Sequence, residues 1–366
     1  MQVSEFDYYL PPERIAQTPI EPRDSARLMV INRQNGDISH HHFTDIVNYF
    51  DSGDLLVANN SRVIPARLFG RKETGGKVEI LLLKKKTATQ WEALVGGKRL
   101  KPGVSVLFDQ HASSSESTAS SCSLLIIDDL GEAKRLVEFN QPIDDQLSSL
   151  GHVPLPPYIQ HALLDEERYQ TIFSRVEGSA AAPTAGLHFT PELLLTLRER
   201  GVGLDYVTLN IGLDTFKPVT AKKVDEHVIH REFTTLTADT AHNINRTKLA
   251  SKRVIAVGTT SVRTIETSAL RAAGHNDSLR QASHLPINQC GWQTVVAVAE
   301  ETDLFIYPGY QFRAVDIMLT NFHLPKSSLL MLVSAFAGAD LIKQAYQIAI
   351  EKAYRFYSFG DAMLIL

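Results

Sequence analysis

The stretch DLLVANNSRV, residues 54–63, decides the fold that the sequence predicts. Residues 54–58 form an apolar run typical of a buried strand, and the run stops at four consecutive polar residues, 59–62. In α/β proteins, ligands bind just beyond the carboxyl ends of buried strands. After Val63 the sequence changes character, so this stretch marks both a candidate site and a domain boundary.

Short strand-like segments follow one another from Val63 to Tyr158. They are KVEILLL, WEALVG, VSVLF, CSLLIID and RLVEFN, separated by turns that carry Gly, Pro or Asp. No segment of helical periodicity and useful length lies between them, which is typical of a small antiparallel barrel or sandwich. Residues 111–123 are rich in serine, so we expect them to form a flexible loop between two of these strands.

Helices and strands alternate in the rest of the chain. The segment TPELLLTLRERG has Thr190 as a helix N-cap and Gly201 as its stop. RVIAVG predicts a buried strand and TTSVRTIETSAL a helix, while TDLFIYPGY and VDIMLT predict two strands ahead of a helix in LPKSSLLMLVSAFAG. This alternation is α/β architecture. We therefore predict an α/β domain from residues 1–62 and 159–366, with an all-β domain inserted at 63–158.

The composition excludes several classes of protein. The chain has 366 residues, of which 44% are hydrophobic, enough for two cores. Its apolar runs are too short to cross a bilayer and its N-terminus has no signal-peptide pattern, so we expect a cytoplasmic protein without a membrane partner. Cys122 and Cys290 supply neither a disulfide framework nor a metal set. Because the net charge is −4, a nucleic-acid partner would need a local basic face.

Two polar turns occur where a helix is expected to begin. The first, AAPTAGLHFT, carries Thr184, Gly186 and His188, and its small residues permit a ligand to approach the backbone at a helix N-terminus. A tight turn with His188 in the core explains the same residues equally well.

The second turn, VGTTSVR, covers residues 257–263. Hydroxyls and backbone N–H groups at residues 258–260 could hold a carboxylate or a ribose, and Arg263 could add a bidentate clamp. The turn lacks both the Gly-Lys-Thr ending of a phosphate loop and the glycine pattern of dinucleotide-binding folds. An ordinary capped helix is the alternative.

A third polar turn, TNFHLPKSS, begins at residue 320. Asn321 and His323 end a strand, and Pro325 fits the start of a helix whose remainder is core. A buried helix explains the apolar residues but not why Asn321 and His323 precede them.

A basic segment lies in the predicted β domain. Residues 83–101 carry six basic side chains against a single acid, Glu92, and on adjacent strands they would make a basic face with Trp91, suited to a phosphate backbone and a stacked base. Solvated strand charges are the alternative. The basic residues are Lys84, Lys85, Lys86, Lys98, Arg99 and Lys101.

The histidines do not predict a metal site. The three at residues 40–42 are consecutive and cannot all face one ion, and His227 and His230 have no third ligand at metal-site spacing. Glu232 beside His230 could instead make an acid–base pair.

Taken together, these stretches resemble the S-adenosylmethionine:tRNA ribosyltransferase-isomerase family of queuosine biosynthesis. The resemblance runs along nearly the whole chain, and so many ordered matches are more specific than any single turn. The matching segments are FDYYLPPERIAQ, RDSARLMV, NNSRVIPARLFG, GGKVEILLL, GHVPLPPYI, ERYQTIF, AAPTAGLHFT, HREF, VGTTSVRTIE, TNFHLP, LLMLVSAFAG and YRFYSFGDAM. The family also implies an α/β domain with an inserted β-barrel.

The resemblance implies an unusual transfer. S-adenosylmethionine would be a co-substrate that donates its ribosyl group to 7-aminomethyl-7-deazaguanine at the wobble position of tRNA, releasing adenine and methionine and leaving epoxyqueuosine. A positive sulfonium acidifies the adjoining C5′ protons, so a positioned base could form an ylide and start the loss of adenine. The wobble base lies in the single-stranded anticodon loop, where it can be splayed out without unpairing a duplex. No prosthetic group and no metal are expected, and we expect a monomer.

Site membership is carried over onto the matching residues. His188 and His323 are the candidate bases, and Phe189, Phe216 and Phe322 could favour the sulfonium through their ring faces. The expected substrate-binding residues are Thr184, Gly186, Gly258, Thr259, Thr260, Arg263, Asn321, Asn59, Asn60, Ser61 and Arg62. The expected tRNA-binding residues are the six basic residues of the 83–101 segment with Trp91.

The segment LNIGLDTF, residues 209–216, departs from the family pattern. That pattern usually has His where Asn210 stands and Gly where Asp214 stands, which puts in doubt any mechanism that uses that histidine. A catalytically silent tRNA-binding member of the family is therefore one rival function. A methyltransferase is the other, although the glycine-rich loop that it requires is not found. Residues 272–300 look longer than the family's usual connection and are expected to form a disordered surface excursion.

Overall fold

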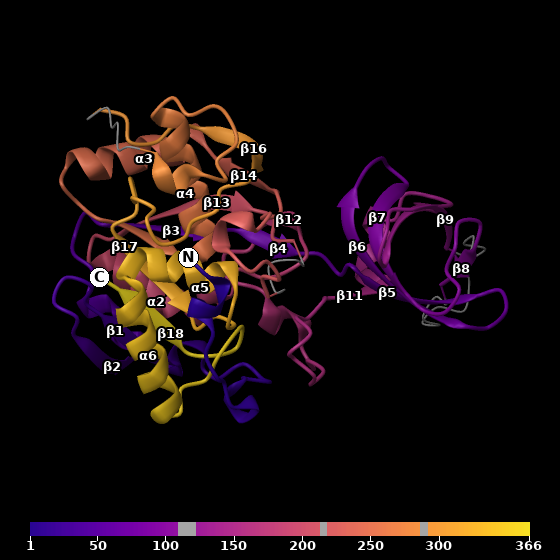
Figure 1. The fold of residues 1–366 in the computed structure, drawn as a ribbon, viewed down its shortest axis with the longest axis horizontal. Helices are drawn as coiled ribbons and strands as arrows, with labels where there is room; N and C mark the ends of the chain where they lie inside the picture. Colours follow the sequence, from indigo (N-terminus) through magenta and orange to yellow (C-terminus); the bar gives the residue numbers. More distant parts are fainter. Residues whose placement is uncertain (109–121, 213–217, 286–291) are drawn as a thin grey trace. The chain divides into compact units, whose positions relative to one another are not determined.

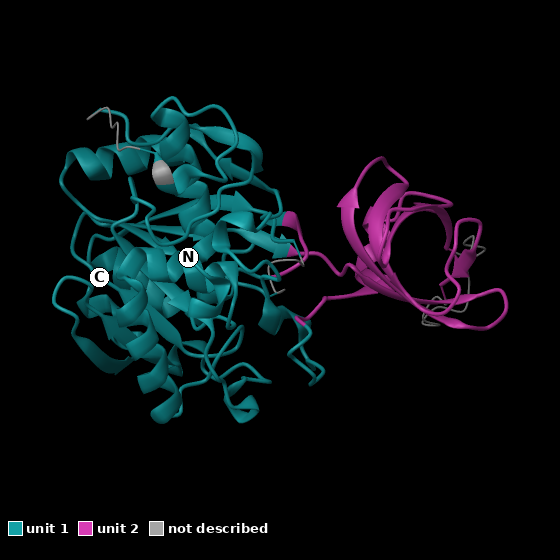
Figure 2. Ribbon diagram, viewed as in Figure 1, with its two compact units in different colours: residues 1–62, 157–176, 182–366 teal, residues 63–156, 177–181 magenta. Residues whose placement is uncertain are grey.

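The computed structural model describes residues 1–108, 122–212, 218–285 and 292–366, and it contains two compact units. The first unit comprises residues 1–62, 157–176 and 182–366, and the second comprises 63–156 and 177–181 (Figure 2). The second segment of the expected α/β domain was placed at 159–366, so it began two residues later than in the structure and included residues 177–181. The serine-rich segment lies almost entirely outside the described residues.

A nine-stranded mixed sheet forms the centre of the first unit, in the order β16-β14-β13-β3-β15-β17-β18-β1-β2 (Figure 1). Strands β13, β3, β15 and β17 are parallel neighbours, so their carboxyl ends meet at one edge. The mixed α/β prediction is confirmed. The strands are β1 (Arg27–Ile31), β2 (Ile38–His42), β3 (Leu55–Asn59), β13 (Gly203–Leu209), β14 (Glu232–Leu236), β15 (Val254–Val257), β16 (Val298–Thr302), β17 (Ile317–Asn321) and β18 (Ala362–Ile365).

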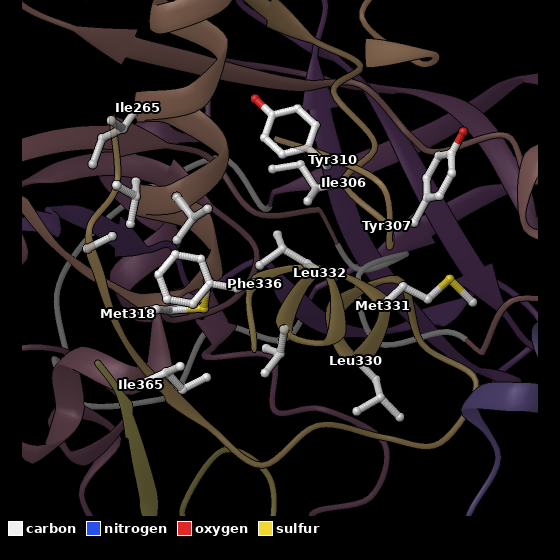
Figure 3. Close-up of a cluster of buried hydrophobic side chains, with 14 of the residues drawn as sticks. Ile265, Ile306, Tyr307, Tyr310, Met318, Leu330, Met331, Leu332, Phe336 and Ile365 are labelled. Atoms are coloured by element: carbon white, nitrogen blue, oxygen red, sulfur yellow. The ribbon is translucent and has the colours of Figure 1, made fainter. Parts of the chain in front are cut away.

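Helices cover both faces of this sheet because its strands alternate between two apolar cores. Leu55 and Val57 of β3 face one core and Leu56 the other. Helices α3 to α6 pack on the first face, where Figure 3 shows Leu332 and Phe336 of α5 in the core. Helix α2 packs on the second face, and Thr190 caps it as predicted. The helices are α2 (Pro191–Glu199), α3 (Ala238–Leu249), α4 (Gly258–Ala272), α5 (Ser328–Ala337) and α6 (Ala339–Glu351).

The second unit is a closed six-stranded antiparallel barrel, as the sequence and the resemblance implied. Its order is β5-β6-β7-β10-β9-β8, and pairing of β5 with β8 closes it. Gly70 of β5, a strand that the sequence analysis missed, makes room for closure, since a Cβ there would lie 2.6 Å from Val106 Cγ1. The strands are β5 (Arg67–Lys72), β6 (Lys77–Lys85), β7 (Gln90–Gly96), β8 (Ser105–Leu107), β9 (Ser123–Asp129) and β10 (Lys134–Phe139), with β11 (Gly151–His152) added beside β5 and the short helix α1 (Leu147–Leu150) before it. Two further strands, β4 (Ser61–Val63) and β12 (Val176–Ser179), pair with each other.

Three local predictions are wrong. The strand expected at 302–310 does not form, because β16 lies earlier in the chain and ends at Thr302. Asp303 is the first residue outside the sheet, and its carboxylate accepts the N–H of Leu279 at 2.9 Å. Helix α5, which follows the third polar turn, begins at Ser328 rather than at Pro325. Ser327 caps this helix, and Lys326 has a φ of +53°, which is not helical.

The third error concerns residues 272–300. Leu279, Ala282 and Val295 pack into the first core, so the described part of this connection is not an exposed excursion. Residues 286–291 lie outside the described residues.

Within the described part of the chain, no single helix is long and apolar enough to cross a membrane. Helices α5 and α6 reach the required length and composition only when taken together, and they are bent by 114° at the break between them.

Helix α4 is buried on every side over its first thirteen residues, although most of these residues are polar. The carboxylate of Glu266 is completely buried and accepts the N–H groups of Arg313 (2.9 Å), Ala314 (2.9 Å) and Val315 (3.0 Å), as well as the hydroxyl of Tyr310 (2.8 Å). Four donors around one carboxylate fix the chain before β17 against α4.

We predict that Glu266→Gln lowers the free energy of unfolding by roughly 3 kcal/mol, because an amide NH₂ would face donors that need an acceptor. Urea unfolding followed by circular dichroism measures the change. Glu199→Gln, at an exposed position of α2, is the control and should stay within about 0.5 kcal/mol of the parent. Equal stability of the two variants would show that the cluster around Glu266 is not a stabilising one.

Candidate active site

One of the cavities in the first unit lies at the carboxyl edge of the parallel strands. Its walls come from the segments that follow three of these strands. They are Ile211 after β13, the start of α4 after β15, and Asn321 at the end of β17 with the residues beyond it. Its empty space is about 540 Å³, counting the open mouth. The described lining residues are Tyr158, Ala182, Pro183, Thr184, Ala185, Ile211, Gly258, Thr259, Thr260, Thr320, Asn321, Phe322, His323, Leu324, Leu329, Tyr357 and Ser358.

The N-terminus of α4 forms one wall. Gly258 has a φ of +85°, a conformation that favours glycine, and it turns the chain from β15 directly into the helix. The N-cap residue, Val257, does not cap the helix with its side chain, and the buried hydroxyl of Thr260 has no hydrogen-bond partner within the described residues. Free N–H groups, a positive helix end and an unpartnered hydroxyl together favour an anionic or strongly polar group at this wall.

Asn321 holds the opposite wall in place. Its Oδ1 accepts the hydroxyl of Thr184 at 3.2 Å, and its Nδ2 lies 3.4 Å from the carbonyl oxygen of Asp361 and 3.2 Å from Nε2 of His188. The carbonyl partner requires a donor, so Nδ2 is a donor and His188 Nε2 accepts. Since His188 does not line the cavity, it acts on the cavity through Asn321.

Both candidate bases are neutral imidazoles. Burial lowers the pKa of His188 to about 4, and a hydrogen bond to the backbone of Arg23 opposes this only in part. Burial lowers the pKa of His323 to about 3. His323 lines the cavity, and its Nε2 lies 2.8 Å from the hydroxyl of Thr320. Of the two histidines, His323 can therefore meet a ligand directly.

Aromatic side chains form a third wall that the sequence analysis did not anticipate. The rings of Tyr158 and Tyr357 have centroids 4.7 Å apart and planes inclined at 53°, and the hydroxyl of Tyr158 lies 2.8 Å from Oγ of Ser358. Both tyrosines lie in segments quoted for the family resemblance, GHVPLPPYI and YRFYSFGDAM, so the signal was present in the sequence. Nothing in the sequence alone showed that these segments meet.

Residues 3–365 of the chain match the model of the family described as queuosine biosynthesis protein. The chain belongs to this family. It is 49% identical over 370 residues to the S-adenosylmethionine:tRNA ribosyltransferase-isomerase of Desulfitobacterium hafniense, and the match covers 100% of both chains. It is also similar to the crystal structure of the S-adenosylmethionine tRNA ribosyltransferase from Thermotoga maritima, with a TM-score of 0.53, 37% identity and coverage of 99% of this chain and 100% of that chain.

In this member of the queuosine biosynthesis family, the cavity brings together six of the residues expected to form the site. They are Thr184, Gly258, Thr259, Thr260, Asn321 and His323. Phe322, one of the expected aromatic residues, also lines the cavity. Phe189 does not, because it is completely buried in the second core, and Phe216 and Asp214 lie outside the described residues.

The four polar residues at the end of β3 and just beyond it, 59–62, do not line the cavity. Asn59 accepts the N–H groups of Ser61 (3.0 Å) and Leu209 (3.2 Å), and it donates to the carbonyl of Leu209, so it ties the end of β3 to the end of β13. Asn60 accepts the hydroxyl of Thr208 at 2.7 Å, and Arg62 forms an ion pair with Glu167. Asn59 therefore satisfies backbone groups where the chain leaves the sheet, whereas Asn60 and Arg62 bond to other side chains.

Two other expected residues also have packing roles. Gly186 gives space to Phe173, whose Cζ would lie 2.7 Å from an added Cβ. Arg263 lies one turn behind the cavity wall, where it forms an ion pair with Glu232 and donates to the carbonyl of Leu304 at 3.2 Å. Glu232 in turn accepts the N–H of Gly212 at 2.9 Å, so Arg263 supports the chain next to Ile211 instead of lining the cavity.

The expected basic face of the barrel is divided. Lys85 pairs with Asp144 (2.5 Å) and Lys86 with Glu92 (2.6 Å), and Trp91 is buried in the barrel core and cannot stack on a base. In the antiparallel register Lys85 opposes Trp91, at the start of β7, whereas the turn with Lys98, Arg99 and Lys101 follows the other end of that strand. Antiparallel pairing separates the two groups by roughly the length of β7, about 20 Å.

The structure contains no histidine-based metal site among the described residues, and His227 lies outside the cavity. Among the described residues, no group of three His, Cys, Asp or Glu side chains is arranged to hold a metal ion. His227 packs edge-on against the ring of Phe305, with centroids 5.3 Å apart.

We predict that the free energy of unfolding falls as the pH is lowered from 6.5 towards 4. His188 and His323 have folded-state pKa values below 6.5, so in this window the unfolded chain binds more protons, and the stability present above pH 6.5 is lost on acidification. His188→Gln should remove about 3 kcal/mol of this fall, since Gln can still accept from Asn321 without titrating. Urea unfolding at several pH values measures it. His161→Gln, at an exposed position, is the control, and an identical profile for His188→Gln would contradict the interpretation.

Proposed function

We propose that the cavity at the carboxyl edge of β13, β3, β15 and β17 is the S-adenosylmethionine site of a tRNA ribosyltransferase-isomerase. The enzyme transfers and isomerises the ribosyl group of S-adenosylmethionine onto 7-aminomethyl-7-deazaguanine at the wobble position of tRNA. The products are epoxyqueuosine in the tRNA, adenine and methionine. Full-length similarity to the relative from Desulfitobacterium hafniense supports this reaction, and the convergence of three polar turns on one cavity supports the site.

The convergence is the observation that carries the proposed site. Three family segments separated by about sixty residues or more meet in it, through Thr184, Thr260 and Asn321. Packing alone does not require an unpartnered buried hydroxyl at Thr260, since a buried polar group without a partner costs free energy. A ligand that accepts from this hydroxyl would offset that cost.

The start of α4 suits the carboxylate of the methionine portion. Residues 258–260 present backbone N–H groups and hydroxyls at a positive helix end, and such a wall binds an anion without a cationic side chain. In this arrangement Arg263 is a positioning residue for the cavity wall rather than a ligand of the carboxylate.

His323 is the better placed of the two bases. A proton leaving C5′ beside the sulfonium needs an acceptor within hydrogen-bond reach, and His323 lines the cavity whereas His188 does not. Its lowered pKa keeps the imidazole unprotonated, so it is free to accept a proton, but it also makes the imidazole a weaker base than an exposed histidine. His188 orients Asn321, which borders the same space.

The tRNA contacts of the barrel are proposed more narrowly than the sequence suggested. Lys98, Arg99 and Lys101 are exposed on one turn and are able to contact a phosphate backbone. Lys85 and Lys86 already pair with acids, which reduces the charge that they offer.

A silent tRNA-binding member of the family is separated from the enzyme by its products. The protein is incubated with S-adenosylmethionine and tRNA that carries the precursor base. Released adenine supports the ribosyltransferase, S-adenosylhomocysteine supports a methyltransferase, and tight tRNA binding without either product supports the silent binder.

We predict that Thr260→Val raises the KM for S-adenosylmethionine roughly tenfold, because it removes one hydrogen bond from the substrate and nothing from the fold. Adenine release at varied S-adenosylmethionine measures KM and kcat. Thr196→Val on the exposed face of α2 is the matched control and should leave both constants unchanged. An unaltered KM in Thr260→Val would remove this hydroxyl from the substrate site.

A further inference from the structure

The described walls of the cavity carry no formally charged side chain. Among the lining residues that the structure describes there is no Asp, Glu, Lys or Arg, and His323 is neutral. S-adenosylmethionine has a positive sulfonium, a positive ammonium and a negative carboxylate. If the proposed function is correct, on which this inference rests, the described walls must recognise the sulfonium without a carboxylate.

Tyr158 and Tyr357 offer ring surface in that cavity. Their hydroxyls are engaged elsewhere, Tyr158 with Ser358 and Tyr357 with Tyr8, which fixes the rings and leaves aromatic surface as what they present to a ligand. The two rings pack against each other, with centroids 4.7 Å apart and planes inclined at 53°, so they form one continuous aromatic patch on the cavity wall that a cation can contact from the cavity. The negative face of an aromatic ring attracts a cation, and the attraction is strongest where water is excluded.

The backbone at Tyr357 is held in an unfavourable conformation. Its φ is +71°, which is rare for a bulky residue, and strained residues gather at functional sites. The N–H of Tyr357 donates to the carbonyl of Phe322 at 3.2 Å, and its carbonyl accepts from Gly360 at 2.9 Å. A Cβ at position 360 would lie 2.5 Å from the carbonyl oxygen of Arg355, so the turn that holds Tyr357 in this conformation requires glycine at position 360.

We propose that the adjoining rings of Tyr158 and Tyr357 bind the sulfonium and select cationic S-adenosylmethionine over neutral sulfur nucleosides. The selection matches the chemistry, because a thioether does not acidify C5′ protons as a sulfonium does. When the ribosyl carbon–sulfur bond breaks, sulfur keeps the electron pair and methionine becomes a neutral thioether. The rings then lose their attraction for the leaving molecule, which favours its release.

The test compares S-adenosylmethionine with S-adenosylhomocysteine, which differ in the methyl group and the positive charge on sulfur. Isothermal titration calorimetry gives Kd for both ligands with the full chain and with Tyr158→Leu, Tyr357→Leu and Tyr357→Phe. The Leu variants should weaken S-adenosylmethionine roughly tenfold and S-adenosylhomocysteine much less, since only the former uses the ring quadrupole. Tyr357→Phe keeps the ring face and should keep the preference. Tyr9→Leu, whose ring is 79% exposed, is the control for loss of a tyrosine.

The possible outcomes separate this inference from the proposed function. Equal loss of both ligands in Tyr158→Leu, or no loss in a folded Tyr158→Leu, overturns the role of the rings while adenine release by the parent protein still supports the enzyme. Failure of the parent to bind S-adenosylmethionine overturns the proposed function itself. Because leucine at a φ of +71° risks misfolding, Tyr158→Leu carries the decision, and a thermal unfolding scan verifies that each variant is folded.

Discussion

The burial of a polar helix is the constraint on which the rest of the α/β unit depends. Helix α4 is enclosed over residues 258–270, so its buried polar groups need partners inside the protein, and the Thr260 hydroxyl at the cavity is an exception that has none among the described residues. Thr264 pairs with Thr234 of β14 (2.5 Å), and Thr267 with Thr302 of β16 (2.7 Å). With the Glu266 cluster, these bonds fix the helix in rotation and translation against the strands and the loops around it.

This fixed helix explains why the site can work with neutral groups. Its N-terminus enters the cavity with free N–H groups, and its next turn supports the wall through Arg263 and Glu232. A rigid dipole in a site of low polarity acts more strongly than a flexible charge that must first be desolvated. The charged groups of the helix therefore hold it in position, while the neutral groups at its N-terminal end line the cavity.

The wall opposite α4 follows the same principle. Asn321, Thr184 and His188 form a hydrogen-bonded chain in which each group has a defined role as donor or acceptor. Burial keeps His188 neutral, and a neutral imidazole is required if its Nε2 is to accept from Asn321. Polar residues that line a site and polar residues that hold those residues in place are thus different sets. A list of polar residues in a turn does not separate them.

Local sequence patterns determined the architecture of this protein and most of its polar turns. The change from mixed helix and strand periodicity to short strands at Val63 indicated an inserted β domain, and the turns at 184, 258 and 321 were recognisable because small and polar residues interrupt apolar runs. The tertiary structure alone decided which of these residues share a cavity. The first turn of α4 lines the cavity, and the 3.6-residue helical period directs Arg263, one turn later, towards Glu232 instead. Asn59 uses its side chain to bond the backbone at the ends of two parallel strands. Tyr158 and Tyr357 meet only because long-range packing brings together segments about two hundred residues apart, and contacts of that kind depend on the whole fold rather than on any local pattern.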